Sequence, residues 1–289
     1  MPVPNVQPFV APSSVLTDPL PVDDPAPPSS PDPPAGASAG DWWVERRDAV
    51  EWLRRVPSSS IDLVVTDPAY ESLEKHRAVG TTTRLSHSKS SSNDWFTVFP
   101  NARFDELFAE VFRVLKPNTH FYLFCDQETA FVAKPKGEAA GFKFWKPLVW
   151  DKLKIGMGYH YRSRYELILF FEKGKRRLRD LGIADVIREA RIHRGYPTEK
   201  PVAVNRILIE QSTEPGEVVL DPFMGTASAG IAALELGRRF RGCDVSEKAI
   251  TIARERLAAT GRPMLAHMPW GQTAVEQLSL GMERGDGSR

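Results

Sequence analysis

Two stretches of the sequence place a carboxylate and a proline directly after an apolar run. In IDLVVTDPAY (61–70) the run predicts a buried strand, which Pro68 ends while biasing Asp67 towards an extended conformation. The Asp67 carboxylate and the Pro68 carbonyl could accept N–H hydrogen bonds, and the Tyr70 ring could stack on a planar group. VVLDPFMGTASAG (218–230) repeats this layout and leads into a predicted helix. Because ligands of open α/β sheets bind at the carboxyl ends of strands, the two stretches predict a shared ligand site.

The second stretch has the features of a cradle for a polar cofactor. Asp221 ends its predicted strand, a turn contains Gly225, and a helix amino terminus follows. Asp244 ends the next predicted strand 23 residues after Asp221, the spacing expected of an acid that binds ribose hydroxyls. The segment FMGTASAG (223–230) does not match G-x-G-x-x-G, so the pattern disfavours a nicotinamide cofactor.

The elements that must position these residues alternate between strands and helices. Predicted strands occupy 42–46, 61–66, 119–125, 142–150, 165–171, 218–220 and 240–243. Predicted helices follow Asp48 as far as Val56, span 101–115, run from after 125 to about 140, include a polar piece ending at about 190, and then span 202–211, 227–236 and the residues from the N-cap Ser246 to Leu257. This alternation predicts the α/β fold class, with a doubly wound and mostly parallel sheet.

Composition divides the 289 residues into a tail, a domain and a second tail. Residues 1–40 hold 12 of the 24 prolines, and residues 1–41 carry five Asp and no Lys or Arg. Such a segment buries too little apolar surface to fold, so 1–40 is predicted to be a disordered acidic tail. Residues 41–272 form the predicted domain, and 273–289 a flexible tail.

Several classes of protein are excluded by composition. No apolar run approaches the roughly 20 residues of a membrane span, and the amino terminus lacks a secretory signal. Two cysteines, Cys125 and Cys243, predict no disulfide framework, and the histidines show no metal-ligand spacing. The sequence therefore predicts a cytoplasmic protein with no metal site and no membrane partner.

The net charge of +1 conceals a basic segment. Between Lys143 and Arg194, 14 Lys and Arg residues stand against 6 Asp and Glu, an excess of +8. This excess is typical of a protein with a polyanionic partner and equally of a solvated face.

The two Asp-Pro stretches together resemble the DNA amino-methyltransferases, which transfer a methyl group from S-adenosylmethionine to adenine N6 or cytosine N4. DPAY is similar to their catalytic tetrad and DPFMGTASAG to their F-x-G-x-G cofactor loop, and the tetrad comes first, as in the β class. Four further segments match in the same order: RDAVEWL, LVWDK, YELILFFEKG and PTEKPVAVNRILIEQSTEPGEVVLDPF. The resemblance covers about 42–260 and implies a Rossmann-like methyltransferase sheet with one antiparallel strand. In the usual strand order of that family, the strands ending at Cys125 and Cys243 lie three positions apart.

The resemblance assigns roles to individual residues around the cofactor. It implies that Asp48 holds the adenine of S-adenosylmethionine and Asp244 its ribose. The other implied cofactor-binding residues are Asp67, Lys200, Asp221, Phe223, Gly225 and Thr226. Ala69 replaces the family's second tetrad proline, Ala227 its second loop glycine, and Tyr196 the usual histidine before P-x-x-K-P.

The resemblance also implies the chemistry. Asp67 and Pro68 would accept the two N–H bonds of an exocyclic amino group, while Tyr70 would stack on the base flipped out of the duplex. In the resembled family, Asp at the first tetrad position goes mostly with adenine, so adenine N6 is the expected target. The alternatives are cytosine N4, an RNA or protein amide, and a catalytically inactive nucleic-acid-binding module. Neither cysteine follows a proline, which excludes the nucleophile of a cytosine-C5 enzyme.

Double-stranded DNA is the expected partner, bound by loops at about 71–100, 151–164 and 174–195. The basic residues expected to contact nucleic acid are Arg84, Lys89, Arg162, Arg164, Lys175, Arg176 and Arg177. A homodimer and a cognate restriction endonuclease are further partners that the resemblance allows.

Overall fold

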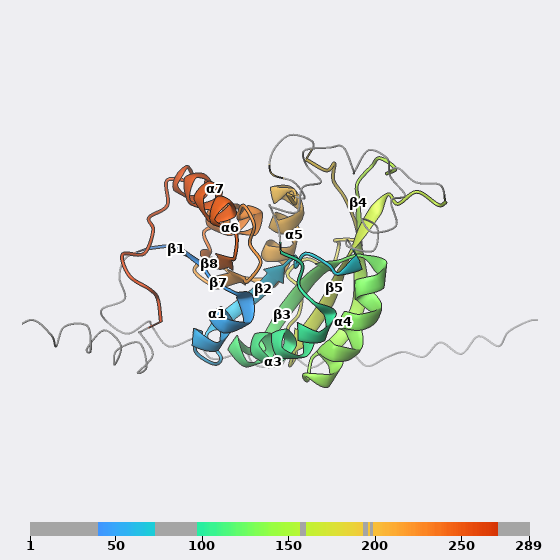
Figure 1. Cartoon of the computed structure of the whole chain (residues 1–289), viewed down its shortest axis with the longest axis horizontal. Coiled ribbons are helices and arrows are strands. Elements are labelled where there is room, and N and C mark those ends of the chain that lie inside the picture. The colour runs from blue at the N-terminus through green and yellow to red at the C-terminus, as the bar shows by residue number, and fades with distance from the viewer. Residues whose placement is uncertain (1–39, 73–96, 157–159, 193–195, 197–198, 271–289) are drawn as a thin grey trace, which may run out of the picture. The chain divides into compact units, whose positions relative to one another are not determined.

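The computed structural model describes residues 40–72, 97–156, 160–192, 196 and 199–270. The chain divides into Met1–Ala37, which lies outside these residues, and Ser38–Arg289, which holds every element described below. The strands are β1 (Trp42–Arg46), β2 (Ile61–Thr66), β3 (Leu115–Cys125), β4 (Lys143–Asp151), β5 (Tyr165–Lys173), β6 (Val186–Arg188), β7 (Val218–Asp221) and β8 (Arg239–Asp244) (Figure 1). The helices are α1 (Ala49–Arg55), the 3-10 turn η3 (Asn101–Arg103), α3 (Phe104–Val114), α4 (Gln127–Ala139), α5 (Val202–Ser212), α6 (Ser228–Glu235) and α7 (Glu247–Ala258). The expected tails 1–40 and 273–289 fall almost wholly outside the described residues, so the predictions made for them stay predictions.

The strands form one sheet in the order β1-β8-β7-β2-β3-β5-β4-β6. All neighbouring pairs are parallel except those that β5 makes with β3 and β4, so β5 alone runs against the others. This confirms the predicted doubly wound α/β sheet with one antiparallel strand. The strands ending at Cys125 and Asp244 are three positions apart, and Cys125 and Cys243 are both buried free thiols.

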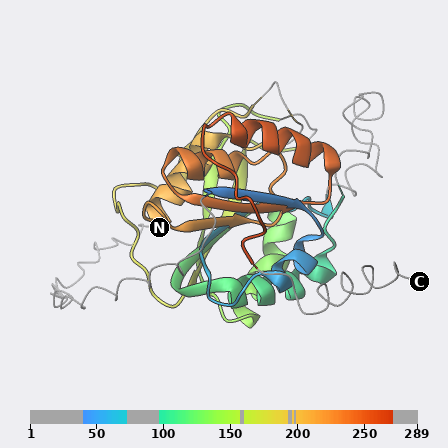
Figure 2. The same cartoon turned by 90° about the vertical axis from the view of Figure 1, so that its left-hand side faces the viewer.

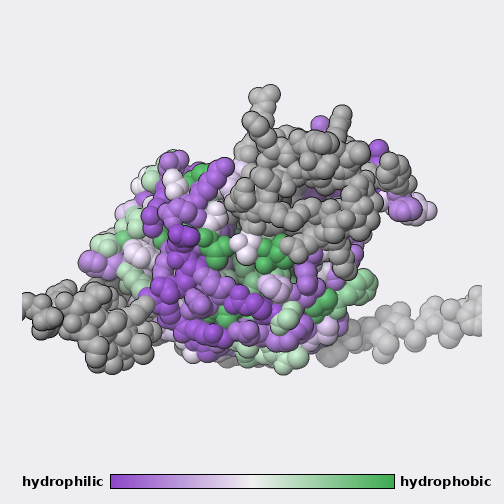
Figure 3. Space-filling view, in the orientation of Figure 1, coloured by the Kyte–Doolittle hydropathy of each residue, from purple (hydrophilic) through white to green (hydrophobic). Residues whose placement is uncertain are grey.

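Helices cover both faces of this sheet, with α1, α3 and α4 on one face and α5, α6 and α7 on the other (Figure 2). The central strand β2 shows why. All six of its residues are buried: Val64 packs into the core beneath α1 and α3, whereas Leu63 and Val65 pack into the core beneath α5 and α6. A strand covered on both faces has a continuous apolar run instead of an alternating one. On the outside, hydrophilic residues predominate over α1 and α3 (Figure 3). Among the helices of the described residues, none is both long and apolar enough to cross a membrane.

The helices begin largely where the sequence predicts. Asp48 caps α1 by accepting hydrogen bonds from two backbone amides, and Ser246 Oγ caps α7 through the amide of Ala249 at 3.3 Å. The start of α6 is different, because Ala227 at its N-cap has a left-handed backbone with φ +60°. A residue with a Cβ is strained there, which explains why the resembled family places glycine at this position.

Two elements differ from the sequence prediction. Strand β3 begins at Leu115, four residues before the predicted Thr119, because Leu115 pairs with Ile61 of β2. The polar piece ending near 190 was predicted as helix, and this prediction is wrong, because Val186–Arg188 forms β6. The amide of Val149 binds the carbonyl of Asp185, so this segment satisfies the otherwise open backbone edge of β4.

Candidate active site

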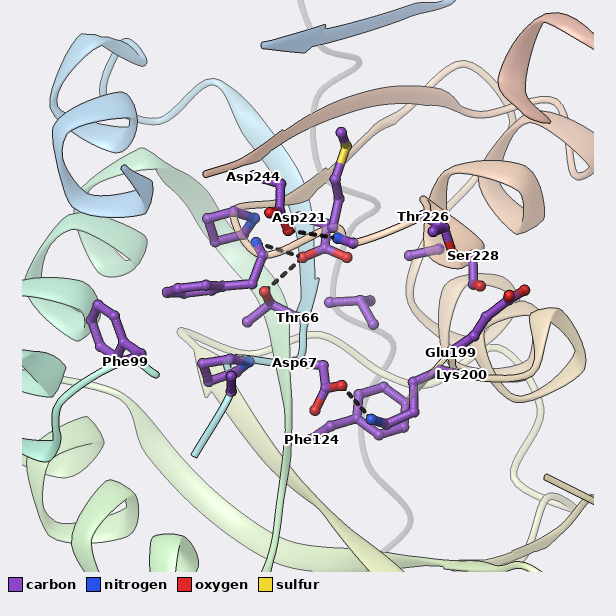
Figure 4. Close-up of a pocket in the computed structure, with 18 of the residues that line it drawn as sticks. Thr66, Asp67, Phe99, Phe124, Glu199, Lys200, Asp221, Thr226, Ser228 and Asp244 are labelled. Carbon is purple, nitrogen blue, oxygen red and sulfur yellow. Dashed lines mark hydrogen bonds and ion pairs between the residues drawn. The ribbon is translucent and has the colours of Figure 1, made fainter. Parts of the chain in front are cut away.

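A cavity of about 700 Å³ opens at the carboxyl end of the sheet, by which we mean the end where the parallel strands finish. Asp67, Asp221 and Asp244 follow or end β2, β7 and β8, and all three line this cavity (Figure 4). The two Asp-Pro stretches therefore do face a shared space, as their sequence predicts. Its volume is within the range of roughly 300–1,000 Å³ usual for small-molecule sites.

Asp221 is the most deeply buried carboxyl at the cavity. Its Oδ1 accepts hydrogen bonds from Thr66 Oγ1 at 2.6 Å and from the amide of Phe223 at 3.0 Å. Burial raises the pKa of Asp221 to about 7, although both hydrogen bonds favour the ionised form. At neutral pH this carboxyl is thus poised between its two charge states.

We expect Asp221→Asn to flatten the pH dependence of stability. Because the pKa of Asp221 is higher in the folded chain, the folded state keeps a proton that the unfolded state loses between about pH 4 and pH 7, so the free energy of unfolding falls as pH rises through that window. An asparagine keeps both hydrogen bonds through its Oδ1 and cannot ionise. Relative to the wild type, it should gain about 2–4 kcal/mol at pH 8 and little at pH 4. Urea unfolding at the two pH values measures this, and equal pH slopes for the two proteins would contradict it.

Asp244 fixes the loop at 223–230 that resembles the family's cofactor loop. Its Oδ2 accepts a hydrogen bond from the amide of Gly225 at 3.0 Å, and its Oδ1 accepts one from the amide of Ser246 at 2.8 Å. Burial raises the pKa of Asp244 above its usual range, against these two hydrogen bonds. Gly225 has φ +52°, a conformation that favours glycine in this turn.

The same loop is tied to the PTEKP segment by a residue that the sequence analysis missed. Arg256 on α7 donates from Nη1 to the carbonyl and hydroxyl oxygens of Thr226, and its Nη2 lies 2.7 Å from Glu199 Oε1. Thr226 and Glu199 both line the cavity. The sequence motif did not indicate Arg256, because this residue lies on α7, 30 residues after Thr226.

Asp48, the predicted adenine-binding residue, lines the cavity beside Arg103. Both carboxylate oxygens accept from the Arg103 guanidinium at 2.8 Å, and Oδ1 also caps α1. The Arg103 hydrogen bonds lower the pKa of Asp48 despite its partial burial. The Arg103 guanidinium itself lies 5.2 Å from the centre of the Phe99 ring. Arg103 was not singled out from the sequence, where it is one basic residue at the start of an amphipathic helix.

Asp67 has a donor on each carboxylate oxygen. Tyr70 Oη donates to Oδ1 at 2.5 Å. Lys200 Nζ contacts Oδ2 on the other side, as Figure 4 shows. Burial raises the pKa of Asp67, while Lys200 acts in the opposite direction. Tyr70 is only 8% exposed, and its observed polar contact is this hydrogen bond. A carboxylate has about four acceptor positions, so Asp67 can still accept from a further N–H donor.

The three departures from the family pattern leave the cavity formed. The Ala69 carbonyl accepts a hydrogen bond from the amide of Phe99 at 2.8 Å, which fixes the tetrad loop without the second proline. Ala227 adopts the left-handed backbone noted above, and Tyr196 lines the cavity near Asp244. Lys152 and Glu166 also line the cavity and were not identified from the sequence. An acid as the second residue of an otherwise apolar strand was the signal that could have indicated Glu166.

The predicted nucleic-acid contacts divide between the two ends of the sheet. Arg162 is exposed, and Arg164 forms an ion pair with Asp151 at 2.6 Å, both in the segment joining β4 to β5 at the carboxyl end. The three predicted contacts Lys175, Arg176 and Arg177 follow β5 at the other end. There the amide of Lys175 binds Asn118 Oδ1, and Arg176 pairs with Glu217 at 2.9 Å, while Arg177 is exposed. Arg84 and Lys89 lie outside the described residues. A basic cavity residue not predicted is Arg191.

The cavity's side chains fit S-adenosylmethionine, which the sequence resemblance implies. Asp244 could accept hydrogen bonds from the ribose hydroxyls, and Phe223 offers an aromatic ring beside the Gly225 turn. Asp221, when ionised, supplies negative charge for a ligand that carries a cationic sulfonium. In the described part of the chain, no group of three or more His, Cys, Asp or Glu side chains could hold a metal ion.

Comparison with known proteins gives one consistent result. The model of a DNA methylase family, N6_N4_Mtase, matches residues 61–255, more than half of the chain. The YubD protein of Escherichia coli (strain K12), named as a candidate methylase, is 31% identical over 222 residues, which cover 75% of this chain and 90% of that protein. The type II methyltransferase M.HpaI of Haemophilus parainfluenzae is 24% identical over 238 residues, which cover 73% of this chain and 72% of that protein.

Solved structures share the fold. The complex of M1.HpyAVI with S-adenosylmethionine aligns with a TM-score of 0.55 at 21% identity, covering 75% of this chain and 99% of that one. The PvuII DNA methyltransferase, which is cytosine-N4-specific, aligns with a TM-score of 0.60 at 15% identity, covering 76% of this chain and 87% of that one.

Proposed function

The chain belongs to the N6/N4 DNA methylase family, the S-adenosylmethionine-dependent DNA amino-methyltransferases, and from this premise we propose that its target is the N6 amino group of adenine. The observation that carries this proposal is the position of Asp67. Its carboxylate stands at the carboxyl end of β2, in the same cavity as Asp221 and Asp244. The acid that would accept an amino N–H and the acids that would hold the cofactor therefore share one space.

The exocyclic amino group is a poor nucleophile, so the chain must activate it for methyl transfer. The lone pair of an exocyclic amino group is delocalised into the base, and S-adenosylmethionine supplies a methyl group on a cationic sulfur. By accepting the two amino N–H bonds, the Asp67 carboxylate and the Pro68 carbonyl would localise that lone pair on nitrogen. Tyr70 fixes Asp67 through the hydrogen bond at 2.5 Å, so the acceptor is oriented before the base enters. Stacking of the flipped base on Tyr70 remains part of the proposal.

The preference for adenine depends on the residue type at position 67. Adenine N6 and cytosine N4 present the same two donors, so the Pro68 carbonyl cannot distinguish them. A carboxylate accepts a charge-assisted hydrogen bond that is stronger than the bond a hydroxyl accepts. The resembled enzymes with Asp at this position act mostly on adenine, which supports N6. Cytosine N4 is the alternative within the same family.

An inactive binding module and an RNA or protein methylase are less well supported. Every side chain that the chemistry needs is present at the cavity, including Asp67, Tyr70, Asp221 and Asp244. Methylases of RNA or protein amides more often have asparagine at the first tetrad position, whereas this chain has Asp67.

The proposal extends to how DNA is bound. Because the base must enter the cavity, we propose that duplex DNA lies across the carboxyl end of the sheet, where Arg162 and Arg191 could contact phosphates. Arg176 and its neighbours at the other end would then lie on a different face from Asp67. The type II methyltransferase relatives support a pairing with a cognate restriction endonuclease. A cytoplasmic location and a homodimer also remain proposals.

Expression in a bacterial host without adenine or cytosine-N4 methylases tests this function. Modification-sensitive sequencing of the host DNA should show N6-methyladenine in one sequence context, which also gives the recognition sequence. A parallel culture expressing Asp67→Ala should show none. Equal modification in both cultures, or in neither, would contradict the proposal.

A further inference from the structure

Four alternating charges form a row along the cavity wall, beginning at Asp67. Lys200 Nζ contacts Asp67 Oδ2 and lies 3.4 Å from Glu166 Oε2. Glu166 Oε1 accepts a hydrogen bond from Lys152 Nζ at 2.5 Å. All four side chains line the cavity and are at most 22% exposed. Charges at these distances and this burial affect one another strongly.

The one antiparallel strand explains why Glu166 reaches this place. A strand running against its neighbours begins where they end, so Glu166, the second residue of β5, lies at the carboxyl end of the sheet. Lys152 directly follows β4, which ends at the same place. Lys152 and Glu166 can pair because Trp150, two residues before Lys152, is the register partner of Glu166 in the β4–β5 ladder.

Packing alone does not account for Glu166. Its Oε2 is buried and makes no hydrogen bond, and its ion-pair partner at 3.4 Å, Lys200 Nζ, lies closer to Asp67. A buried carboxylate oxygen that has an ion pair but no hydrogen bond is incompletely satisfied, so its presence at a ligand cavity indicates a role towards the ligand or towards its partners.

We propose that Glu166 is a positioning residue for methyl transfer: held by Lys152, it shares Lys200 with Asp67 and limits how strongly Lys200 binds the Asp67 carboxylate. This inference rests on the proposed function, because it acts through Asp67. If Asp67 were the sole partner of Lys200, its carboxylate would be a weaker acceptor for the amino group. Glu166 keeps Lys200 between two carboxylates and so keeps Asp67 available.

The charges around Asp67 predict the direction of each change. The titratable groups that face it are Tyr70 from the same loop, Lys200 before α5, Glu166 from β5, Asp221 from β7 and Cys125 from β3. Burial raises the pKa of Asp67, Lys200 lowers it, and the Glu166 charge raises it further. Removing the Glu166 charge should therefore lower the pKa of Asp67. Lys152 partly neutralises Glu166, so removing the Lys152 charge should raise the pKa of Asp67 through Glu166.

Glu166→Gln and Lys152→Met test these opposite directions in the full-length protein. The carboxyl pKa of Asp67 is followed by ¹³C NMR of protein labelled at aspartate, with Asp67→Asn to assign the signal. The acid side of the pH profile of kcat is measured in parallel. We expect both to move to lower pH in Glu166→Gln and to higher pH in Lys152→Met. For Glu166→Gln, kcat should fall about 10-fold or more, with KM for S-adenosylmethionine within about 2-fold of the wild type.

The matched control is Glu217→Gln. Glu217 has an exposure close to that of Glu166 and also pairs with a cation, Arg176 at 2.9 Å, but lies at the opposite end of the sheet. Its replacement should leave the Asp67 pKa and kcat unmoved. If Glu166→Gln left the Asp67 pKa and kcat unchanged, the inference would be overturned. If Glu166→Gln does not fold, Lys152→Met provides the same test, with an expected displacement to higher pH. A wild-type protein that transfers no methyl group would defeat the proposed function, whereas the pKa displacements would still support the coupling of Glu166 to Asp67.

Discussion

Replacing Asp67 with alanine is expected to lower methyl-transfer turnover at least about 100-fold, the usual effect of removing one preorganised partner of the transition state. Cofactor binding should remain within a few-fold of the wild type. The reason is structural, because Asp221 and Asp244 are held by backbone amides and Thr66 and not by Asp67. Single-turnover methyl transfer to DNA and calorimetry with S-adenosylmethionine measure the two quantities.

Asp62→Ala is a matched control for the loss of a buried acid. Asp62 lies on β2, the strand that Asp67 follows, is 4% exposed, and pairs with Lys116 at 2.7 Å, but it is at the opposite end of β2 from the cavity. It should lower stability and leave turnover per folded molecule unchanged. Normal turnover in Asp67→Ala, or an equal loss in both variants, would remove Asp67 from the chemistry.

Replacing Asp244 with alanine is expected to produce the converse result. The carboxylate holds the amides of Gly225 and Ser246 and is the proposed acceptor for the ribose hydroxyls. Hydrogen bonds to a charged group contribute about 1.5–3 kcal/mol each. Losing the two proposed bonds to the ribose hydroxyls should therefore weaken S-adenosylmethionine binding about 100-fold. Turnover at saturating cofactor should stay near the wild-type value, because the Asp67 end of the cavity is untouched.

Asp126→Ala serves as the control for this variant. Asp126 also follows a strand at the carboxyl end of the sheet and also binds a backbone amide, that of Thr129 at 2.8 Å, but it does not line the cavity. Its replacement should leave the dissociation constant for the cofactor unchanged. If both variants weakened binding alike, Asp244 would be acting through the general stability of this end of the sheet.

The sequence was sufficient for the parts of the site that continuous segments build. Strands β2 and β7 are short, largely apolar runs that lead into Asp67 and Asp221, and parallel strands bring such ends together. The antiparallel strand and the separation of Cys125 from Cys243 followed from the family resemblance, and the structure confirms both. The individual site roles stay predictions, although the cavity contains every predicted catalytic and cofactor-binding residue.

The parts that sequence reasoning missed depend on contacts between distant segments. Arg103 and Arg256 were not singled out from the sequence, since only the folded chain brings them to Asp48 and Thr226. The short strand β6 was mistaken for a helix because three residues show no clear periodicity, and its stability comes from pairing with β4. The separation of Arg162 from Arg176 was hidden for the same reason, because β5 carries the chain from one end of the sheet to the other.

The account is tested most directly by identifying the product of the purified protein. Unmodified duplex DNA is incubated with S-adenosylmethionine that carries a deuterated methyl group, digested to nucleosides and analysed by mass spectrometry. The account predicts deuterated N6-methyldeoxyadenosine, formed by the wild type and absent with Asp67→Ala. Labelled N4-methyldeoxycytidine as the sole product, or no labelled nucleoside at all, would contradict it.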